Sequence, residues 1–339
     1  MWRLWFEKQW QYTGWAQCLL LPFSWLFALL VSLRRLFYRY GVFSKNTLPV
    51  PVIIVGNISV GGVGKTPLVI YLAKQLRAAG YQPGILSRGY GGRTTGEVLP
   101  VSDSYQYGDE PVLIAQRSLC PVWVHPVRTE GGRHLLNAHP EINVLICDDG
   151  LQHYALERDI EIAVVQRPHG LGNGHLLPAG PLRESLNRLQ DVDIVVETGE
   201  LPEFLPAKPY FQQSLQPGRW TAVSDFSSQV SNEHFQHKPL VAIAGIGHPQ
   251  RFFQSIKAME LKFETRIFPD HHAYVAEDFM DVAGKTILMT EKDAVKCRNL
   301  GLTDAWFLPV STELAPIGHS QTLTACVVSL LKQYEGKAK

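Results

Sequence analysis

A glycine-rich segment between an apolar run and an amphipathic segment constrains the fold of this chain more than any other feature. The run 51–57 (PVIIVGN) predicts a buried strand, and the repeat of Leu68, Leu72 and Leu76 every four residues predicts a helix after it. The residues that join them are Ser59, Val60, Gly61, Gly62, Val63, Gly64, Lys65 and Thr66. A strand, a glycine-rich turn and a helix in this order predict a phosphate-binding loop of the P-loop NTPase type.

The chemistry of this loop follows from its residue types. Backbone N–H groups and the helix N-terminus favour phosphate oxygens, Lys65 is expected to reach the β- and γ-phosphates, and Thr66 offers its hydroxyl to Mg²⁺. The strict pattern has glycine where this chain has Ser59, which leaves the GKT end intact. Guanine specificity favours an [NT]KxD sequence, and the segment 290–293 (TEKD) has its lysine in another place. We therefore expect ATP and Mg²⁺ as the cofactors.

A pair of carboxylates at the end of a later apolar run supports the same site. The run 143–146 predicts a buried strand, and Asp148 and Asp149 follow it. In P-loop proteins a carboxylate at a strand end holds Mg²⁺ directly or through water. Asp148 and Asp149 are therefore candidate metal-binding residues.

Short Val/Ile-rich runs alternate with helical segments from residue 50 onward, which predicts an α/β fold with a parallel sheet covered on both faces. The predicted strands are 51–57, 84–87, 143–149, 159–165, 193–198, 239–247, 286–290 and 306–310. Residues 201–238 are rich in turn-forming residues and predict a connecting region. The expected parts are an N-terminal helical segment (1–45), a P-loop nucleotide-binding domain (46–200), the connecting region, and a second, smaller α/β domain (239–335).

The N-terminal segment has a composition unlike the rest. No charged residue occurs between Gln9 and Leu33, and five of the eight tryptophans fall in the first 25 residues. Arginines at 34, 35 and 39 follow, which by the positive-inside tendency keeps the later chain in the cytoplasm. We expect a membrane-associated helix, either spanning or interfacial because Pro22 interrupts the run. The alternatives are a cleaved signal peptide and an amphipathic hairpin docked on the protein.

Charge and cysteine content exclude other classes. The formal net charge is +1, with 32 basic and 31 acidic residues, which argues against a nucleic-acid partner. The five cysteines are scattered singly, so neither a disulfide framework nor a thiolate zinc site is predicted. Nothing in the sequence indicates an obligate protein partner.

Several loops carry groups that a phosphoryl transfer would use. The segment 87–93 (SRGYGGR) offers arginines for phosphate, 107–111 (YGDEP) a carboxylate, and 178–184 (PAGPLRE) an ion pair. The segment 268–272 (FPDHH) places a carboxylate beside two imidazoles, which suits a metal, an oriented base or a polar turn.

The motifs GNISVGGVGKTP, SRGYGGR, YGDEP, CDDGLQH, GNGHLLPAGPLRE, FPDHHAY and MTEKDAVKC, in this order behind an apolar helix, resemble the tetraacyldisaccharide 4'-kinase family of lipid A biosynthesis. The resemblance covers nearly the whole chain. It implies transfer of the γ-phosphate of ATP to the 4'-hydroxyl of tetraacyldisaccharide 1-phosphate, forming lipid IVA for lipopolysaccharide. It also implies a peripheral or monotopic place at the cytoplasmic face of the inner membrane.

The resemblance further implies residue roles. Asp109 pairs with His271 to activate the hydroxyl, with Asp270 in support, although His272 is an alternative to His271. The implied metal ligands are Thr66, Asp148, Asp149 and Glu184, and the implied substrate-binding residues are Arg88, Tyr90 and Arg183. Because Asp109 and His271 fall in different expected domains, we expect them to meet only on domain closure.

Two other functions remain open at this stage. One is a P-loop switch ATPase or GTPase of the metallochaperone or partitioning type, which shares the glycine-rich loop. The other is a membrane adaptor that binds nucleotide without catalysis. The first leaves the N-terminal helix and the Asp109 and His271 motifs without a role.

Overall fold

A computed structural model describes residues 9–168, 170–201 and 207–337, which form two compact units. Unit 1 comprises the described residues within 1–88, 127–214 and 313–339, and unit 2 comprises 89–126 and 215–312. The units are therefore not consecutive in sequence. The expected division at 200 and 239 differs from this one, because residues 89–126 pack with the later part of the chain.

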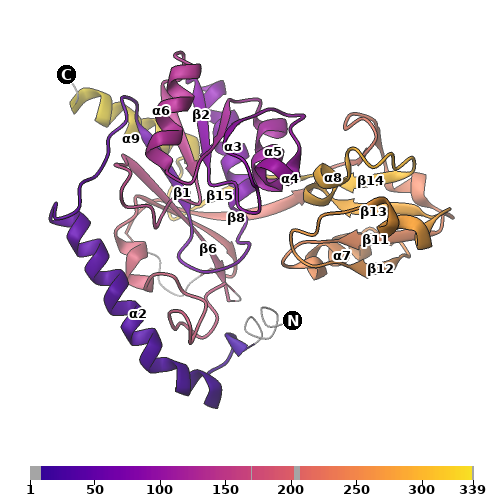
Figure 1. The fold of residues 1–339 in the computed structure, drawn as a ribbon, viewed down its shortest axis with the longest axis horizontal. Helices are drawn as coiled ribbons and strands as arrows, with labels where there is room; N and C mark the ends of the chain where they lie inside the picture. The colour runs from indigo at the N-terminus through magenta and orange to yellow at the C-terminus, as the bar shows by residue number, and fades with distance from the viewer. Residues whose placement is uncertain (1–8, 169, 202–206, 338–339) are drawn as a thin grey trace. The chain divides into compact units, whose positions relative to one another are not determined.

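The sheet of unit 1 has β1 among its central strands, and the phosphate loop connects β1 to α3 (Figure 1). Its strands follow the order β15-β8-β7-β6-β1-β5-β2. Strand β1 pairs in parallel with β5 and β6, and every residue of β1 is buried. The bounds are β1 Val52–Gly56, β2 Pro83–Ser87, β5 Val144–Asp148, β6 Ile160–Arg167, β7 Ile194–Gly199, β8 Tyr210–Pro217 and β15 Val310–Ile317.

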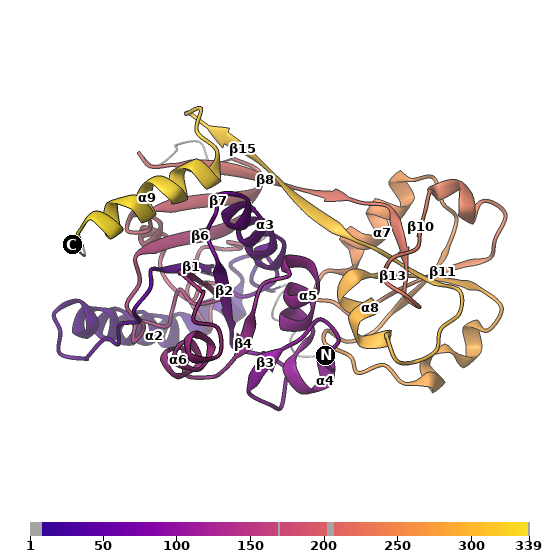
Figure 2. The ribbon, with the colours of Figure 1, turned by 90° about the horizontal axis from the view of Figure 1, so that it is seen from above.

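Helices pack on this sheet. Helix α6 contacts β2, and α9 contacts β6 and α3 (Figure 2). Helix α3 buries the leucines of its four-residue repeat, Leu68, Leu72 and Leu76, against β1, β2 and β5. The helices of unit 1 are α2 Trp15–Arg39, α3 Lys65–Ala78, α6 Arg128–Ala138, the 3-10 helix η1 Leu186–Gln190 and α9 Leu323–Lys337.

Helix α2 has an inverted burial pattern. It is long and apolar enough to cross a membrane, and only 11% of its apolar window is buried. Its buried residues are the polar Gln17 and Ser24. The exposed apolar side chains are Trp15, Leu19, Phe23, Trp25, Leu26, Leu29, Leu30, Leu33, Leu36 and Phe37. Pro22 lies inside the helix and does not end it, so the predicted apolar helix is confirmed as one continuous element.

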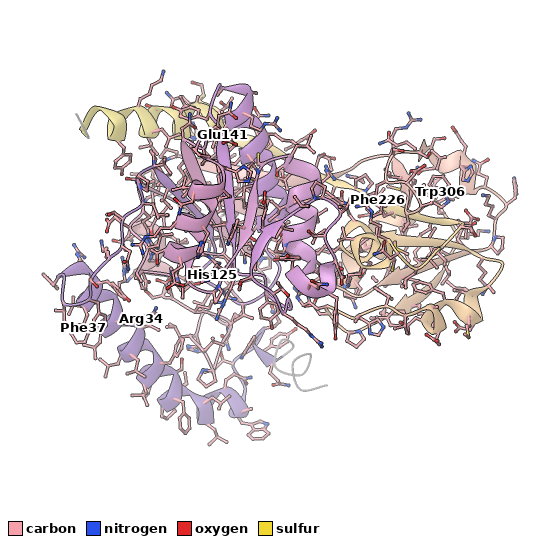
Figure 3. The ribbon with its side chains drawn as sticks, turned by 45° about the horizontal axis from the view of Figure 1, so that its top comes forward. Arg34, Phe37, His125, Glu141, Phe226 and Trp306 are labelled. Carbon is pink, nitrogen blue, oxygen red and sulfur yellow. The ribbon has the colours of Figure 1, made fainter. Side chains whose placement is uncertain are left out.

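Polar contacts fix α2 to unit 1. The Ser24 hydroxyl donates to the carbonyl of Leu176 at 2.7 Å. Arg34, labelled on α2 in Figure 3, lies 5.7 Å from the ring of Tyr154. Arg35 forms an ion pair with Asp191 at 2.6 Å. Two of the arginines that follow the apolar run therefore contact protein.

Unit 2 contains a six-stranded sheet in the order β10-β9-β14-β13-β11-β12. Strands β11, β12, β13 and β14 are parallel, and β9 joins them antiparallel. The bounds are β9 Trp220–Ala222, β10 Gln229–Val230, β11 Leu240–Ala244, β12 Glu264–Ile267, β13 Thr286–Thr290 and β14 Ala305–Leu308. Buried aromatic residues such as Trp220, Phe235 and Phe252 fill one of its two core clusters.

The segment 89–126 adds further elements to unit 2. These are β3 Gly96–Val98, α4 Ser104–Tyr107, α5 Asp109–Ser118 and β4 Val122–Val124. Helices of the later segment are α7 Pro249–Ala258, α8 Glu291–Cys297, η2 Asn232–Phe235 and η3 Ala276–Val282. Helix α5 contacts α8, which joins the early segment to the late one.

The α/β class with two sheets is confirmed, and each predicted strand has a counterpart. The region 201–238 is more than a connector, since it supplies β8 to unit 1 and β9 and β10 to unit 2. Its polar composition conceals these strands: β8 contains three glutamines, and Gln213 is buried. Helix α9 belongs to unit 1 and not to a C-terminal domain.

Candidate active site

The phosphate loop adopts left-handed backbone only where it has glycine. Gly61 and Gly64 have φ of 116° and 90°, conformations that side chains disfavour. Ser59 lies outside the left-handed region and forms an antiparallel bridge with Leu182. The departure from the strict pattern at Ser59 is therefore compatible with the loop, because no positive φ is required there.

Lys65 lies at the first turn of α3 and contacts two polar groups. Its Nζ lies 3.0 Å from Oδ1 of Asn57 and 3.2 Å from Oδ1 of Asp149. Arg183 lies 3.3 Å from the other oxygen of Asp149. Burial raises the pKa of Asp149, but Lys65 and Arg183 outweigh it and lower the pKa below its usual value. Asp149 also has φ of 49°, which is unusual for a non-glycine residue.

The oxygen donors expected for Mg²⁺ lie at strand and helix ends of unit 1. Thr66 and Asp148 are buried at the start of α3 and the end of β5. Glu184 accepts hydrogen bonds from Gln152 at 2.7 Å and from Tyr154, and lies 3.3 Å from Arg188. An all-oxygen donor set suits Mg²⁺.

No cluster of three or more His, Cys, Asp or Glu side chains that could hold a metal ion was found within the described residues. Mg²⁺ in nucleotide sites keeps waters and phosphate oxygens and needs only one or two protein carboxylates. The donor set at Thr66, Asp148 and Asp149 therefore fits a nucleotide-bound Mg²⁺.

Four further polar residues of unit 1 touch the loop or its carboxylates, and the sequence did not single them out. Asn57 orders the loop through its amide, which donates to the carbonyl of Ser59 at 2.6 Å. Thr198 and Gln213 donate to the carbonyls of Val63 and Gly64, each at 3.2 Å. The fourth is Gln152, the hydrogen-bond donor to Glu184. Asn57 and Gln152 lie within the GNISVGGVGKTP and CDDGLQH motifs, which was the available signal, whereas Thr198 and Gln213 lie in none of the motifs.

Asp109 and His271 form a hydrogen bond in unit 2. Oδ2 of Asp109 lies 3.2 Å from Nδ1 of His271, and Asp109 is 5% exposed. Asp109 begins α5 directly after Gly108, whose φ is 94°. His271 has φ of 58°, so the turn that carries it holds a non-glycine residue in left-handed conformation.

The pair is electrostatically coupled. Burial raises the pKa of Asp109, but the hydrogen bond with His271 and the charge of Lys292 oppose it, and the pKa falls to about 2. The hydrogen bond to Asp109 raises the pKa of His271, although burial lowers it. Asp109 is therefore ionised at neutral pH and stabilises the protonated imidazole.

The neighbours of the pair distinguish the two histidines. Asp270 lies 3.8 Å from Nε2 of His271, and the ring of Tyr90 lies 5.3 Å from the imidazole. His272 instead contacts Asp278 at 2.8 Å and stacks on Phe268. His271 is thus the histidine that meets Asp109.

The expectation that the pair meets only on domain closure is wrong. Asp109 and His271 both belong to unit 2, and they are in contact within it. The boundary of the units falls between Arg88 and Gly89, so the SRGYGGR motif contributes Arg88 to unit 1 and Tyr90 to unit 2. Arg88 and Tyr90 are both exposed.

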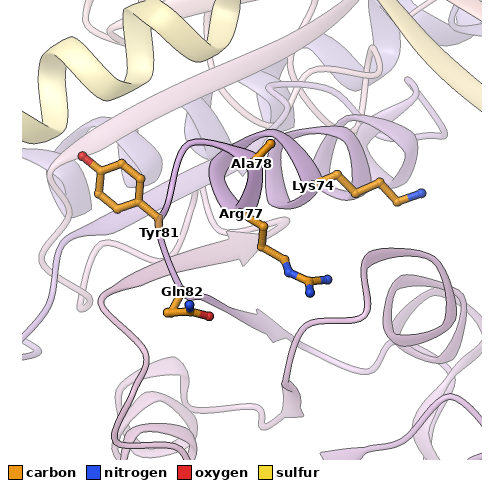
Figure 4. Close-up of a pocket in the computed structure, with 5 residues that line it drawn as sticks. All are labelled: Lys74, Arg77, Ala78, Tyr81 and Gln82. Atoms are coloured by element: carbon orange, nitrogen blue, oxygen red, sulfur yellow. The ribbon is translucent and has the colours of Figure 1, made fainter.

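A hollow on the surface of unit 1 lies away from the phosphate loop. It is lined by Lys74, Arg77, Ala78, Tyr81 and Gln82 at the C-terminal end of α3 (Figure 4). Lys65 lies at the opposite end of the same helix, so this hollow is separate from the phosphate loop.

Comparisons with known proteins agree with the motifs. The family model described as tetraacyldisaccharide-1-P 4'-kinase matches residues 16–329. The tetraacyldisaccharide 4'-kinase of Methylobacillus flagellatus is 50% identical over 313 residues, covering 91% of this chain and 92% of that protein. That of Shewanella loihica is 44% identical and covers 98% of this chain and 96% of its own length.

A solved structure extends this agreement to the fold. It is the "apo" form LpxK from Aquifex aeolicus in complex with ATP, with a TM-score of 0.80 and 32% sequence identity. The match covers 93% of this chain and 99% of that chain. Family model, relatives and fold together show that this chain belongs to the tetraacyldisaccharide-1-P 4'-kinase family.

Proposed function

We propose that the protein transfers the γ-phosphate of ATP to the 4'-hydroxyl of tetraacyldisaccharide 1-phosphate, which yields lipid IVA and ADP. The observation that carries this proposal is the hydrogen bond between Asp109 and His271, because a switch ATPase has no need of a base for an acceptor hydroxyl. The phosphate loop with Lys65 and Thr66 supplies the site for the donor.

His271 acts as the general base in this reaction. Its Nδ1–H donates to Asp109, which leaves Nε2 as the acceptor for the proton of the 4'-hydroxyl. The hydroxyl oxygen attacks the γ-phosphorus, the bond from phosphorus to the leaving ADP oxygen breaks, and the proton passes to Nε2. Asp109 stabilises the imidazolium that forms, and Asp270 lies close enough to add to this effect.

The phosphate loop stabilises the charge of the transferring group. Backbone N–H groups of Gly61 to Gly64 and the Lys65 ammonium bind the phosphates. Thr66, Asp148 and Asp149 would hold Mg²⁺, with Glu184 in support, and the ion would neutralise phosphate charge. Because Asp149 already pairs with Lys65, phosphate oxygens compete with this carboxylate when ATP binds.

Three polar residues, Arg88, Tyr90 and Arg183, are assigned to the acceptor lipid. Tyr90 is 66% exposed and lies against His271, where its hydroxyl can contact a sugar. Arg88 and Arg183 are suited to phosphate, and Arg183 contacts Asp149.

The apolar face of α2 is assigned to the cytoplasmic face of the inner membrane, in a peripheral or monotopic mode. Exposed tryptophan and leucine side chains suit the boundary between headgroups and acyl chains. Ser24 of α2 contacts Leu176, and Leu182 of the same segment, 176–182, pairs with Ser59 of the phosphate loop. One segment therefore contacts both the membrane-binding helix and the loop that binds ATP.

A single assay tests the reaction. Detergent-solubilised protein is incubated with γ-labelled ATP and a disaccharide lipid acceptor, and label in lipid is the expected result. Label in free phosphate alone would support the switch ATPase, and no transfer of label would support a nucleotide-binding adaptor.

Membrane placement needs its own assay. Flotation with vesicles that contain anionic lipid should carry the wild-type protein upward. The double variant Phe23→Glu, Trp25→Glu should remain at the bottom, because two charges on the exposed face oppose insertion. Equal flotation of both proteins would reject α2 as the anchor.

A further inference from the structure

The motif at 290–297 (TEKDAVKC) has no role in the reaction described so far. It forms the end of β13 and helix α8. Thr290 caps the helix by accepting a hydrogen bond from the backbone N–H of Asp293 at 3.2 Å. Helix α8 packs on α5, the helix that begins with Asp109.

Two ion pairs connect α8 to α5. Lys292 donates to the carboxylate of Glu110, the residue next to Asp109, and its side chain is 30% exposed. Glu291 and Arg117 lie 2.5 Å apart at the other end of α5. Both ends of α5 are therefore held by consecutive residues of α8.

The same helix also holds the turn that carries His271. The carbonyl of Gly245 accepts hydrogen bonds from the backbone N–H of His271 and from Nζ of Lys296, each at 3.2 Å. Asp293 is fully buried and accepts from the N–H of Gly245 at 3.1 Å, and Tyr274 donates to it at 3.2 Å. A Cβ at Gly245 would lie 2.8 Å from the hydroxyl of Tyr274, so this junction is tightly packed.

The charged groups that act on the pair within the described residues come from three elements. Asp109 and Glu110 come from α5, Asp270 and His271 from the turn, and Lys292 and Lys296 from α8, with the Tyr90 ring against the imidazole. The positive charge of Lys292 acts on both Asp109 and His271 and lowers the pKa of each.

We propose that Lys292 is a positioning residue for the transfer reaction: it fixes the first turn of α5 to α8 and keeps a positive charge beside the Asp109–His271 pair. This role rests on the proposed function of that pair as the base. A neutral residue at 292 removes the ammonium that pairs with Glu110 and acts on Asp109, so the imidazole holds its proton more strongly. The base then becomes active only at higher pH.

The test compares pH profiles of lipid phosphorylation for Lys292→Gln, Lys292→Arg and the wild type. Glutamine keeps a hydrogen bond to Glu110 without the charge, and we expect the acid limb of kcat/KM to move up by about one pH unit, with KM for ATP within about twofold of the wild type. Lys292→Arg should return the acid limb of kcat/KM to its wild-type position. Lys285→Gln is the matched control, because Lys285 forms a surface ion pair with Glu264 in the same unit.

Glu110→Gln keeps the test decisive should Lys292→Gln not fold. It leaves the charge of Lys292 unneutralised beside the pair, so the acid limb should move to lower pH. A uniform loss of activity at every pH in Lys292→Gln, or an acid limb that stays in place or rises in Glu110→Gln, would overturn the proposal.

The titration of the His271 imidazole, followed by NMR in the full chain, gives the same comparison without turnover. The midpoint should rise in Lys292→Gln and stay in Lys292→Arg. Absence of lipid phosphorylation by the wild type would reject the proposed function, whereas an unchanged titration would reject the role of Lys292.

Discussion

The phosphate loop of unit 1 and the Asp109–His271 pair of unit 2 both involve a charged or titratable side chain on left-handed backbone, but the contacts of these side chains serve opposite purposes. Asp149, which contacts Lys65 of the loop, and His271 of the pair are both non-glycine residues in left-handed conformation, with φ of 49° and 58°. Lys65 contacts Asp149, and on the proposed mechanism phosphate replaces that contact when ATP binds. On the same mechanism the reaction uses the Asp109–His271 hydrogen bond in the form seen here. Loss of a loop residue should therefore appear in nucleotide binding, and loss of a pair residue in turnover.

The largest effect is expected for Asp109→Ala. Without the carboxylate, His271 loses its orientation and the partner of its positive form, so kcat should fall about 1000-fold while KM for ATP stays within about twofold. Steady-state kinetics with the lipid acceptor measures both. His272→Ala is the control, because His272 faces Asp278 and should keep turnover within about threefold. A loss confined to KM for ATP would erase the contrast between the two regions.

The opposite pattern is expected for Lys65→Ala. Removal of the ammonium takes a charge-assisted contact from the β- and γ-phosphates, and kcat/KM for ATP should fall about 100-fold. Direct binding of a fluorescent ATP analogue should weaken in parallel. Unchanged nucleotide affinity in this variant would contradict the role of the loop.

The pH dependence of the wild type sharpens the role of the pair. His271 must be neutral to accept a proton, and its pKa is raised above 6.5, so kcat/KM should rise with pH through a midpoint above 6.5 and change about tenfold per pH unit below it. Asp109→Asn should lower that midpoint in whatever activity remains.

The contribution of His271 to stability should fall as pH rises, whereas activity should increase. Because the folded-state pKa of His271 is raised, its contribution to stability is complete below the unfolded pKa and is lost as pH rises through the folded value. Thermal denaturation of the wild type and of His271→Ala should therefore converge as pH increases. Curves that diverge at high pH would speak against the raised pKa.

The smallest effect is expected for Ser59→Gly, which restores the strict loop pattern. Ser59 needs no positive φ, and its buried hydroxyl has no hydrogen-bond partner among the described residues. Activity should stay within about twofold and stability within about 1 kcal/mol of the wild type. Gly64→Ala is the comparison, since φ of 90° strains any side chain and should cost about 1–2 kcal/mol. Kinetics and chemical denaturation of both variants measure the difference.

The two regions also differ in how far the sequence predicts them. The loop, its strand and its helix are contiguous, so glycine content and apolar spacing identify them. Asp109 and His271 are 162 residues apart, and no local pattern relates them. The family resemblance pairs the two residues, but their order in the chain predicts different domains for them. The packing of α5 on α8, which brings them into one unit, is a tertiary contact that no local sequence pattern reports.

Polar residues within strands set a second limit. Strand β8 lies in a region that turn-forming residues mark as a connector, yet its Gln213 is buried and donates to the carbonyl of Gly64. Hydropathy assigns the same value to a glutamine that is buried and hydrogen-bonded to a loop carbonyl as to one that is exposed. Hydropathy therefore finds the strands at the centre of the sheet and misses this one.

The polar anchoring of α2 has a kinetic consequence. On the proposed membrane placement, the apolar face confines the enzyme to a surface, while Ser24 ties the helix to the loop that reaches Ser59. Enzyme and acceptor lipid then meet by lateral diffusion. Turnover would follow the mole fraction of acceptor within the bilayer, so dilution with inert lipid would slow the reaction at constant bulk concentration.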